Sequence, residues 1–215
     1  MIFVYGTSHV SEESLELIEK EIDDKDPDIV ALELDINRLH AMLNDNRQSQ
    51  GPVFIRGMKF FQDMIGKKTG VMPGDEMTYA YNKAVNEGRD IALIDQDIRI
   101  TVQKLQDVSL REKVKAGASL LLGMVSTKGF DMKSIPHEDF LDQILGEMKF
   151  KFPQLYEALV ADRNHYMKAS LEHLQDENPD EDIIAFVGAA HKKEIERMLA
   201  EDSYEIGSED SVERQ

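Results

Sequence analysis

Short apolar runs alternate with amphipathic stretches along much of the chain. The run at 2–5 is apolar with β-branched and aromatic residues, which predicts a buried strand. The run at 29–35 is almost continuously apolar, a pattern typical of a strand buried on both faces of a parallel sheet. Further strands are predicted at 90–94 and 183–187, and helices at 11–23, 37–43, 53–68, 76–86 and from 192 to about 200.

This alternation predicts an α/β fold with a central, mostly parallel β-sheet and flanking helices. The pattern from 101 to about 176 is wholly helical, with a break near 128–136, and predicts a helical layer inserted before the last strand. We therefore expect a single domain over 1–206. The remaining residues, 207–215, are acidic and poor in apolar side chains, and we expect a disordered tail there.

Composition narrows the classes of function. The chain has 215 residues and a formal net charge of −17, which argues against nucleic-acid binding because phosphate contacts need clustered Lys and Arg. Cysteine is absent, so disulfides, thiolate metal ligands and cysteine nucleophiles are excluded. The longest apolar stretch, near 118–125, is too short for a membrane span of roughly 20 residues, and no basic region precedes the first apolar run. We expect a cytoplasmic protein.

Two identical modules follow the first and the last predicted strands. Gly6-Thr7-Ser8-His9 ends the first strand, and Gly188-Ala189-Ala190-His191 ends the last. Open α/β sheets bind ligands beyond the carboxyl ends of their strands, and histidine supplies a nitrogen ligand or a proton acceptor near neutral pH. His9 and His191 are therefore interpreted as metal ligands, or as a base and an electrostatic helper. The alternative is two loop histidines without a role, which the duplication disfavours.

Glu33 interrupts the most apolar strand pattern. A carboxylate is costly to bury unless it is paired, hydrogen-bonded or metal-bound. Glu33 is therefore predicted to be a third ligand or the partner that orients an imidazole. The alternative is a solvated strand end, but Asp35 suits that role better.

Other charged residues have two open interpretations. Asp97 and Arg99 follow the third predicted strand and could hold a substrate carbonyl or carboxylate, or form a structural ion pair. Arg163 lies on a long predicted helix and could reach the site, although spacing alone favours a helix-surface arginine.

These residues carry a resemblance to the TraB family, which belongs to a wider group with the Tiki proteases and the erythromycin-esterase and ChaN-like proteins. The paired Gly-x-x-His motifs and the intervening glutamate are its specific part. Supporting segments are Ala31-Leu32-Glu33-Leu34-Asp35 with Arg38, Gly74-Asp75-Glu76-Met77, Ile94-Asp95-Gln96-Asp97-Ile98-Arg99, and Asp162-Arg163 with Tyr166-Met167.

The resemblance implies an α/β sheet with a helical layer and a site built from His9, Glu33 and His191. In the Tiki relatives the activity is metal-dependent peptide cleavage with manganese or cobalt, and Arg163 matches a family arginine thought to lie near the site. Many archaeal TraB proteins continue into C-terminal membrane helices. The chain is therefore expected to be either the soluble domain alone or a part without its membrane helices.

Our leading hypothesis is a metal-dependent hydrolase acting on a peptide or small-molecule carbonyl substrate. His9, Glu33 and His191 would hold manganese, cobalt or zinc. Arg163 and Arg99 would stabilise the oxyanion, while Arg38, Asp97 and Arg163 would contact the substrate.

Two alternatives stay open. In a metal-free hydrolase, His9 would act as general base, oriented by Glu33, with charge stabilised by His191 and Arg163. The TraB family also includes bacterial pheromone-shutdown proteins, which block a peptide signal. In a binding protein of this kind, the same pocket would sequester a peptide without cleaving it. The sequence does not decide the oligomeric state, and a homodimer is one of the alternatives.

Overall fold

The computed structural model describes residues 1–7, 12–43, 75–126 and 137–209. Its centre is an open, four-stranded, all-parallel sheet with the strand order β1-β4-β2-β3. The strands are β1 (Ile2–Thr7), β2 (Ile29–Leu32), β3 (Asp90–Leu93) and β4 (Ile183–Gly188). The predicted α/β fold with a parallel sheet is confirmed.

The strand order explains the apolar patterns. β4 and β2 are the two central strands, and every residue of both is buried, as expected when helices cover both faces of a parallel sheet. The first strand pairs with the last, with Gly6 opposite Val187 and Thr7 opposite Gly188. The two Gly-x-x-His modules therefore begin side by side, although their sequences lie at opposite ends of the chain.

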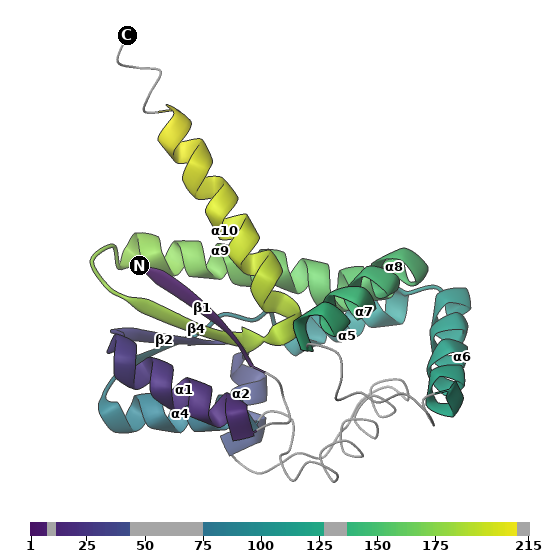
Figure 1. Cartoon of the computed structure of the whole chain (residues 1–215), viewed down its shortest axis with the longest axis horizontal. Coiled ribbons are helices and arrows are strands. Elements are labelled where there is room, and N and C mark those ends of the chain that lie inside the picture. Colours follow the sequence, from purple (N-terminus) through teal and green to yellow (C-terminus); the bar gives the residue numbers. More distant parts are fainter. Residues whose placement is uncertain (8–11, 44–74, 127–136, 210–215) are drawn as a thin grey trace.

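Helices cover the two faces of the sheet (Figure 1). On one face, Ile18 and Met77 pack in the same apolar cluster as Phe186, and on the other face Met167 and Ile195 pack with Val4 and Ala185. The first face carries α1 (Glu12–Lys25), α2 (Ile36–Leu43) and α4 (Asp75–Glu87), and the second carries α9 (Asp162–Glu177) and α10 (Ala189–Glu209).

The predicted helical block divides into two parts. Its last helix, α9, lies on the sheet, whereas the helices before it lie beyond the carboxyl ends of the strands (Figure 1). They are α5 (Ile98–Asp107), α6 (Leu110–Ser126), α7 (His137–Lys151), α8 (Pro153–Tyr156) and η2, a π-helical turn (Glu157–Ala161) that leads into α9. None of the helices in the described part of the chain is long and apolar enough to cross a membrane.

Some predicted boundaries are wrong. The strand predicted over 29–35 ends at Leu32, because the Asp35 side chain accepts the Asn37 and Arg38 amide N–H groups and so starts α2. The helix after β4 begins at Ala189 and continues to Glu209 rather than ending near 200.

Other boundaries are confirmed or lie outside the structure. The helix predicted over 76–86 is confirmed as α4, which Gly88 ends with a φ of +71°, a conformation that favours glycine. The predicted break at 128–136, the predicted helix at 53–68 and residue 11, where the first helix is predicted to begin, lie outside the described residues. The division into a domain over 1–206 and a tail over 207–215 stays a prediction.

Candidate functional site

Four charged or polar side chains meet where the strands of the sheet end. Glu33 follows β2, Asp95 follows β3, and His191 lies in the first turn of α10 after β4. Arg163 reaches them from the first turn of α9. Because the carboxyl ends of parallel strands share one edge of the sheet, residues far apart in sequence converge here.

Arg163 is the hub of this cluster. Its Nε lies 3.1 Å from Asp95 Oδ1, and its Nη2 lies 2.7 Å from Asp95 Oδ2 and also donates to Glu33 Oε1. Its Nη1 donates to the Leu159 carbonyl at 3.3 Å and lies 3.1 Å from His191 Nε2. A guanidinium has five N–H donors, and these contacts give each of the five a protein partner. In this arrangement Arg163 positions the other groups.

Glu33 is buried, with a side chain only 3 % exposed, and ionised. Its Oε1 accepts from Arg163 and its Oε2 accepts from the Gly188 amide N–H. Burial by itself raises the pKa of Glu33, but the positive charges of His191 when protonated, Arg163 and Arg38 outweigh it and hold that pKa at about 2. Burial likewise lowers the pKa of Arg163, and the facing carboxylates more than reverse this.

The contacts of His191 define its tautomer. A guanidinium has no acceptor, so Nε2 of His191 must be the unprotonated nitrogen that accepts from Arg163 Nη1. Nδ1 then carries the proton and donates to Asn164 Oδ1 at 2.6 Å. The Nε2 lone pair is directed into the cluster, 3.6 Å from Glu33 Oε1.

Arg38 connects the cluster to its exposed rim. Its Nη1 lies 2.6 Å from Asp95 Oδ2, and its side chain is 32 % exposed. Arg38 and Arg163 balance the charges of Asp95 and Glu33, so these four groups carry no net charge. Of the residues predicted for the site, the structure brings together Glu33, Arg38, Arg163 and His191.

Asp97 and Arg99 form a separate pair. Asp97 is the N-cap of α5 and accepts from both the amide and the side chain of Arg99. These hydrogen bonds from Arg99 hold the pKa of Asp97 at about 2. Asp97 also accepts from Asn37 Nδ2 at 3.3 Å, and the Arg99 side chain is 81 % exposed. The structure thus contains the ion pair that was one of the two interpretations, and a substrate-binding role for these residues stays a prediction.

His9 lies outside the described residues. The pairing of Thr7 with Gly188 brings the described end of the first module beside the start of the second. The meeting of His9 with His191 stays a prediction.

Sequence reasoning missed Asp95 and Asn164. Asp95 stands directly after the third strand run, beside the strand that precedes Glu33, and this position was the available signal. Asn164 lies on the same buried face of α9 as Met167 and Leu171, which pack on the sheet. Apolar residues are the norm on such a face. A polar residue in an apolar stripe indicates a buried partner, which here is His191.

Two donors among the described residues could serve as ligands of a divalent metal ion. No group of three His, Cys, Asp or Glu side chains is arranged as a metal site within the described residues, and the predicted third ligand, His9, lies outside them. Glu33 Oε1 and His191 Nε2 could hold one ion in place of the Arg163 N–H groups that they now accept, because the carboxylate is ionised and Nε2 is unprotonated. Metal-bound histidines usually donate their other N–H to an oxygen, as His191 does to Asn164. These two donors therefore fit a metal ion, and the guanidinium of Arg163 now supplies the positive charge between them.

Comparison with known proteins identifies the family of the chain. Residues 1–206 match the model of the TraB/PrgY/gumN family. The chain is 34 % identical to "Uncharacterized protein MJ1365" of Methanocaldococcus jannaschii over 92 % of its length and 53 % of that protein. It is 24 % and 23 % identical to the TraB domain-containing proteins of Bos taurus and Homo sapiens, in each case over 94 % of the chain and 63 % of the relative. The chain thus spans from about half to somewhat under two thirds of the length of these curated relatives, and it belongs to the TraB/PrgY/gumN family.

Proposed function

We propose that this chain is a hydrolase that uses a divalent metal ion to cleave a peptide or a small carbonyl substrate. One observation carries the proposal: Glu33 Oε1 and His191 Nε2 converge to 3.6 Å, the first ionised and the second with its lone pair held inward. A carboxylate and a neutral imidazole are a donor pair that manganese, cobalt and zinc accept.

Glu33 and His191, with His9 as the third ligand, would hold the ion. When bound, it would supply a water whose pKa is lowered toward neutrality. Asn164 keeps the proton on Nδ1 of His191 and therefore keeps Nε2 available as a ligand. The Gly188 amide holds the second carboxylate oxygen of Glu33, which limits the rotation of that side chain.

Arg163 has a role that depends on exchange of partners. All five of its N–H groups are engaged, so binding a substrate oxyanion requires it to release one of them. A metal ion on His191 Nε2 and Glu33 Oε1 would take the place of the Arg163 N–H groups that these two atoms now accept. Those N–H groups would then be free for a substrate oxyanion, while the contacts of Nε and Nη2 with Asp95 continue to hold the guanidinium in place.

Metal content tests the proposal independently of any substrate. The purified protein should take up one equivalent of manganese, cobalt or zinc after metal-free dialysis, and the variants H9A, E33Q and H191A should lose that uptake. R99M is the matched control, since Arg99 is exposed and pairs with Asp97. Equal metal uptake in wild type and H191A would contradict the proposed ligand set. A peptide library then tests turnover, which should be lost on chelation and restored by the metal that bound.

The contact between Arg163 Nη1 and His191 Nε2 favours a second candidate, a metal-free hydrolase. There Arg163, held in place by His191 Nε2, would stabilise developing negative charge, and His9 would be the general base for water. Turnover by metal-free protein that is insensitive to chelators would support this version. Peptide that is bound but recovered intact after long incubation with metal-loaded protein would instead indicate a sequestering module.

A further inference from the structure

Arg38 presents two N–H donors beside the site that the protein does not use itself. Asp95, whose side chain is 2 % exposed, accepts from Nη1 of Arg38 at 2.6 Å. No other described residue accepts from the side chain of Arg38, so Nε and Nη2 keep their N–H groups available. These two nitrogens form one edge of the planar guanidinium, which matches the two oxygens of a carboxylate.

Two other arginines near this edge of the sheet use the same pair of nitrogens for carboxylates of the protein. Arg163 directs Nε and Nη2 to the two oxygens of Asp95. Arg99 does the same with the two oxygens of Asp97. Arg38 thus differs from both, because its corresponding edge is open and its side chain is partly exposed at the rim of the site.

Arg38 also lies next to the groups proposed to act in hydrolysis. Asp95 Oδ2 accepts from Arg38 at 2.6 Å and from Nη2 of Arg163 at 2.7 Å, so one oxygen atom joins the two guanidiniums. The charge of Arg38 is near enough to help lower the pKa of Glu33. In a peptide, only one nitrogen and one Cα separate the last amide carbonyl carbon from the terminal carboxylate carbon. A substrate with that carbonyl oxygen on Arg163 can therefore reach Arg38 with its carboxylate.

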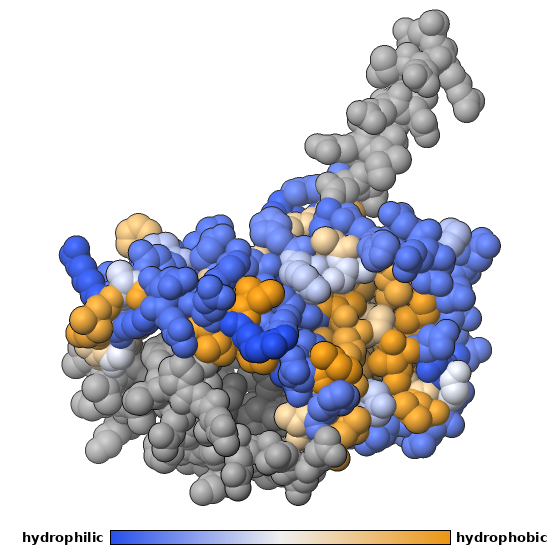
Figure 2. Space-filling view, turned by 180° about the vertical axis from the view of Figure 1, so that it is seen from behind, coloured by the Kyte–Doolittle hydropathy of each residue, from blue (hydrophilic) through white to orange (hydrophobic). Residues whose placement is uncertain are grey.

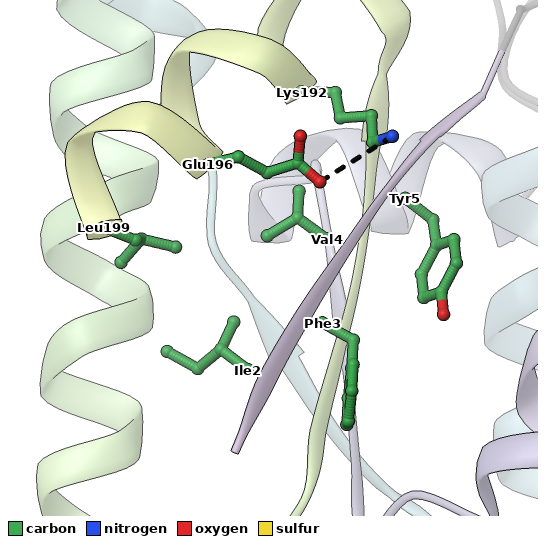
Figure 3. Close-up of a pocket in the computed structure, with 7 residues that line it drawn as sticks. All are labelled: Ile2, Phe3, Val4, Tyr5, Lys192, Glu196 and Leu199. Carbon is green, nitrogen blue, oxygen red and sulfur yellow. Dashed lines mark ion pairs between the residues drawn. The ribbon is translucent and has the colours of Figure 1, made fainter. Parts of the chain in front are cut away.

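The rest of the molecule does not attract carboxylates in a general way. The formal net charge is −17, and on the face shown in Figure 2 hydrophilic side chains surround an apolar patch. Lys192 lines a groove between β1 and α10, but Glu196 lies 3.7 Å from it and offsets its charge (Figure 3). Selection of a carboxylate therefore requires a local contact such as the open edge of Arg38.

We propose that Arg38 binds the free C-terminal carboxylate of the substrate, so that the reaction releases the last residue of a peptide. This inference rests on the proposed hydrolase function. Nε and Nη2 of Arg38 would donate to the carboxylate while Nη1 stays on Asp95. Hydrolysis breaks the C–N bond of the last amide, and water supplies a hydroxyl to the carbonyl carbon and a proton to the leaving amine. With Glu33 on the metal ion, Asp95 alone would balance Arg38 and Arg163, which leaves one positive charge for the carboxylate.

Matched peptides test the carboxylate separately from the metal. N-acetylated tripeptides with a free C-terminal acid are compared with the same sequences as C-terminal amides. Ligand-observed NMR titration measures their binding to metal-free protein, and mass spectrometry measures their cleavage by metal-loaded protein. The wild type should prefer the acids by about tenfold or more in both measurements. R38M and R38K should each lose most of this preference, because lysine keeps the charge beside Asp95 but not the paired donors.

K192M is the matched control, because the Lys192 side chain is 38 % exposed against 32 % for Arg38 and borders the groove between β1 and α10. K192M should keep the preference for acids, and metal uptake and circular dichroism of all three variants should match the wild type. Equal treatment of acids and amides by the wild type, including binding of neither, would overturn the proposal and leave metal uptake to decide the hydrolase function.

A preference that R38K retains in full would also overturn it, since Arg38 would then only balance the charge of Asp95. The two proposals fail in different ways. Acid-selective binding that R38M and R38K abolish, in a protein that neither takes up metal nor cleaves either peptide, would support the carboxylate contact and contradict the hydrolase.

Discussion

The Arg163 cluster and the Arg99 pair use the same chemistry near the same edge of the sheet but in opposite surroundings. Arg163 joins Glu33, Asp95 and His191 from separate elements, and its side chain is 15 % exposed. Arg99 contacts Asp97, two residues before it, and its side chain is 81 % exposed. The contacts of Arg163 depend on the tertiary fold, whereas the contacts of Arg99 lie within the start of a single helix.

The pKa values of the two carboxyl groups show why a shifted pKa alone does not identify a site. Both Glu33 and Asp97 have a pKa of about 2. For Glu33, buried positive charges overcome a large desolvation cost, whereas for Asp97 the cause is local hydrogen bonding by Arg99 in contact with solvent. Only at Glu33 does removal of the partner leave a charge buried without compensation.

Replacement of Arg163 should have the largest effect of any substitution in this comparison. R163M keeps most of the aliphatic stem but leaves the carboxylates of Glu33 and Asp95 without their shared cation, and the free energy of unfolding should fall by about 3–5 kcal/mol. R99M should leave it nearly unchanged, because the pair with Asp97 is solvated. Urea unfolding of both variants measures the difference. Equal losses would show that the Arg163 cluster is not buried in the way described.

The pH dependence of stability should separate the two carboxylates next. The pKa of Glu33 is lowered from 4.5 to about 2 on folding, so the unfolded chain takes up the proton first as the pH falls. Its contribution is therefore fully present above about pH 4.5 and is lost as the pH falls toward about 2, an effect on the order of a few kcal/mol. Denaturant titrations of metal-free wild type and E33Q measure it. The difference between the two curves should shrink over this window, and a constant difference would contradict the assignment.

The fold was predictable because its signals are local and periodic. Continuous apolar runs identify β2 and β4 as buried parallel strands, and the turn at Gly88 is recognisable from one residue. Glu33 was recognisable for the same reason, since one acid interrupts the most apolar strand pattern. In these cases the type of residue is informative within its own segment. A buried carboxylate, for example, costs free energy unless it has a partner, so Glu33 in an apolar run indicates one.

The remaining site residues depend on contacts that no local pattern contains. Asp95 and Asp97 both follow β3, and the difference between them is which one faces Arg163 and Arg38 across the sheet edge. Likewise, Arg163 has the sequence context of an ordinary helix-surface arginine. Only the folded arrangement, with the strand order β1-β4-β2-β3, brings its side chain to Glu33. The end of β2 shows the opposite case, where capping by Asp35 overrides an apolar pattern that continues to Leu34.

Replacement of Asn164 should have a smaller effect, on metal affinity, and it tests only the metal-dependent version of the proposed function. N164L removes the acceptor for Nδ1–H of His191, so the tautomer with a free Nε2 lone pair is no longer favoured. Affinity for the bound metal should fall about 10- to 100-fold, as for other groups that orient a metal-binding histidine. Competition titration with a chromogenic chelator measures the affinity. N37A is the control, because Asn37 donates to Asp97 instead, and an equal loss in both variants would argue against the role of Asn164.

Asp97 should give the smallest effects, and they separate capping from substrate binding. D97A removes the N-cap of α5 and should lower the free energy of unfolding by about 1 kcal/mol, whereas D97N should change it by only a few tenths, because asparagine caps a helix as well as aspartate. Denaturant unfolding of both variants measures this. Because D97N keeps the cap and removes the charge, its turnover of any substrate found for the wild type tests the other predicted role of Asp97. Unchanged turnover would indicate that Asp97 and Arg99 only stabilise the start of α5. A loss of tenfold or more with normal stability would support their predicted role in substrate binding.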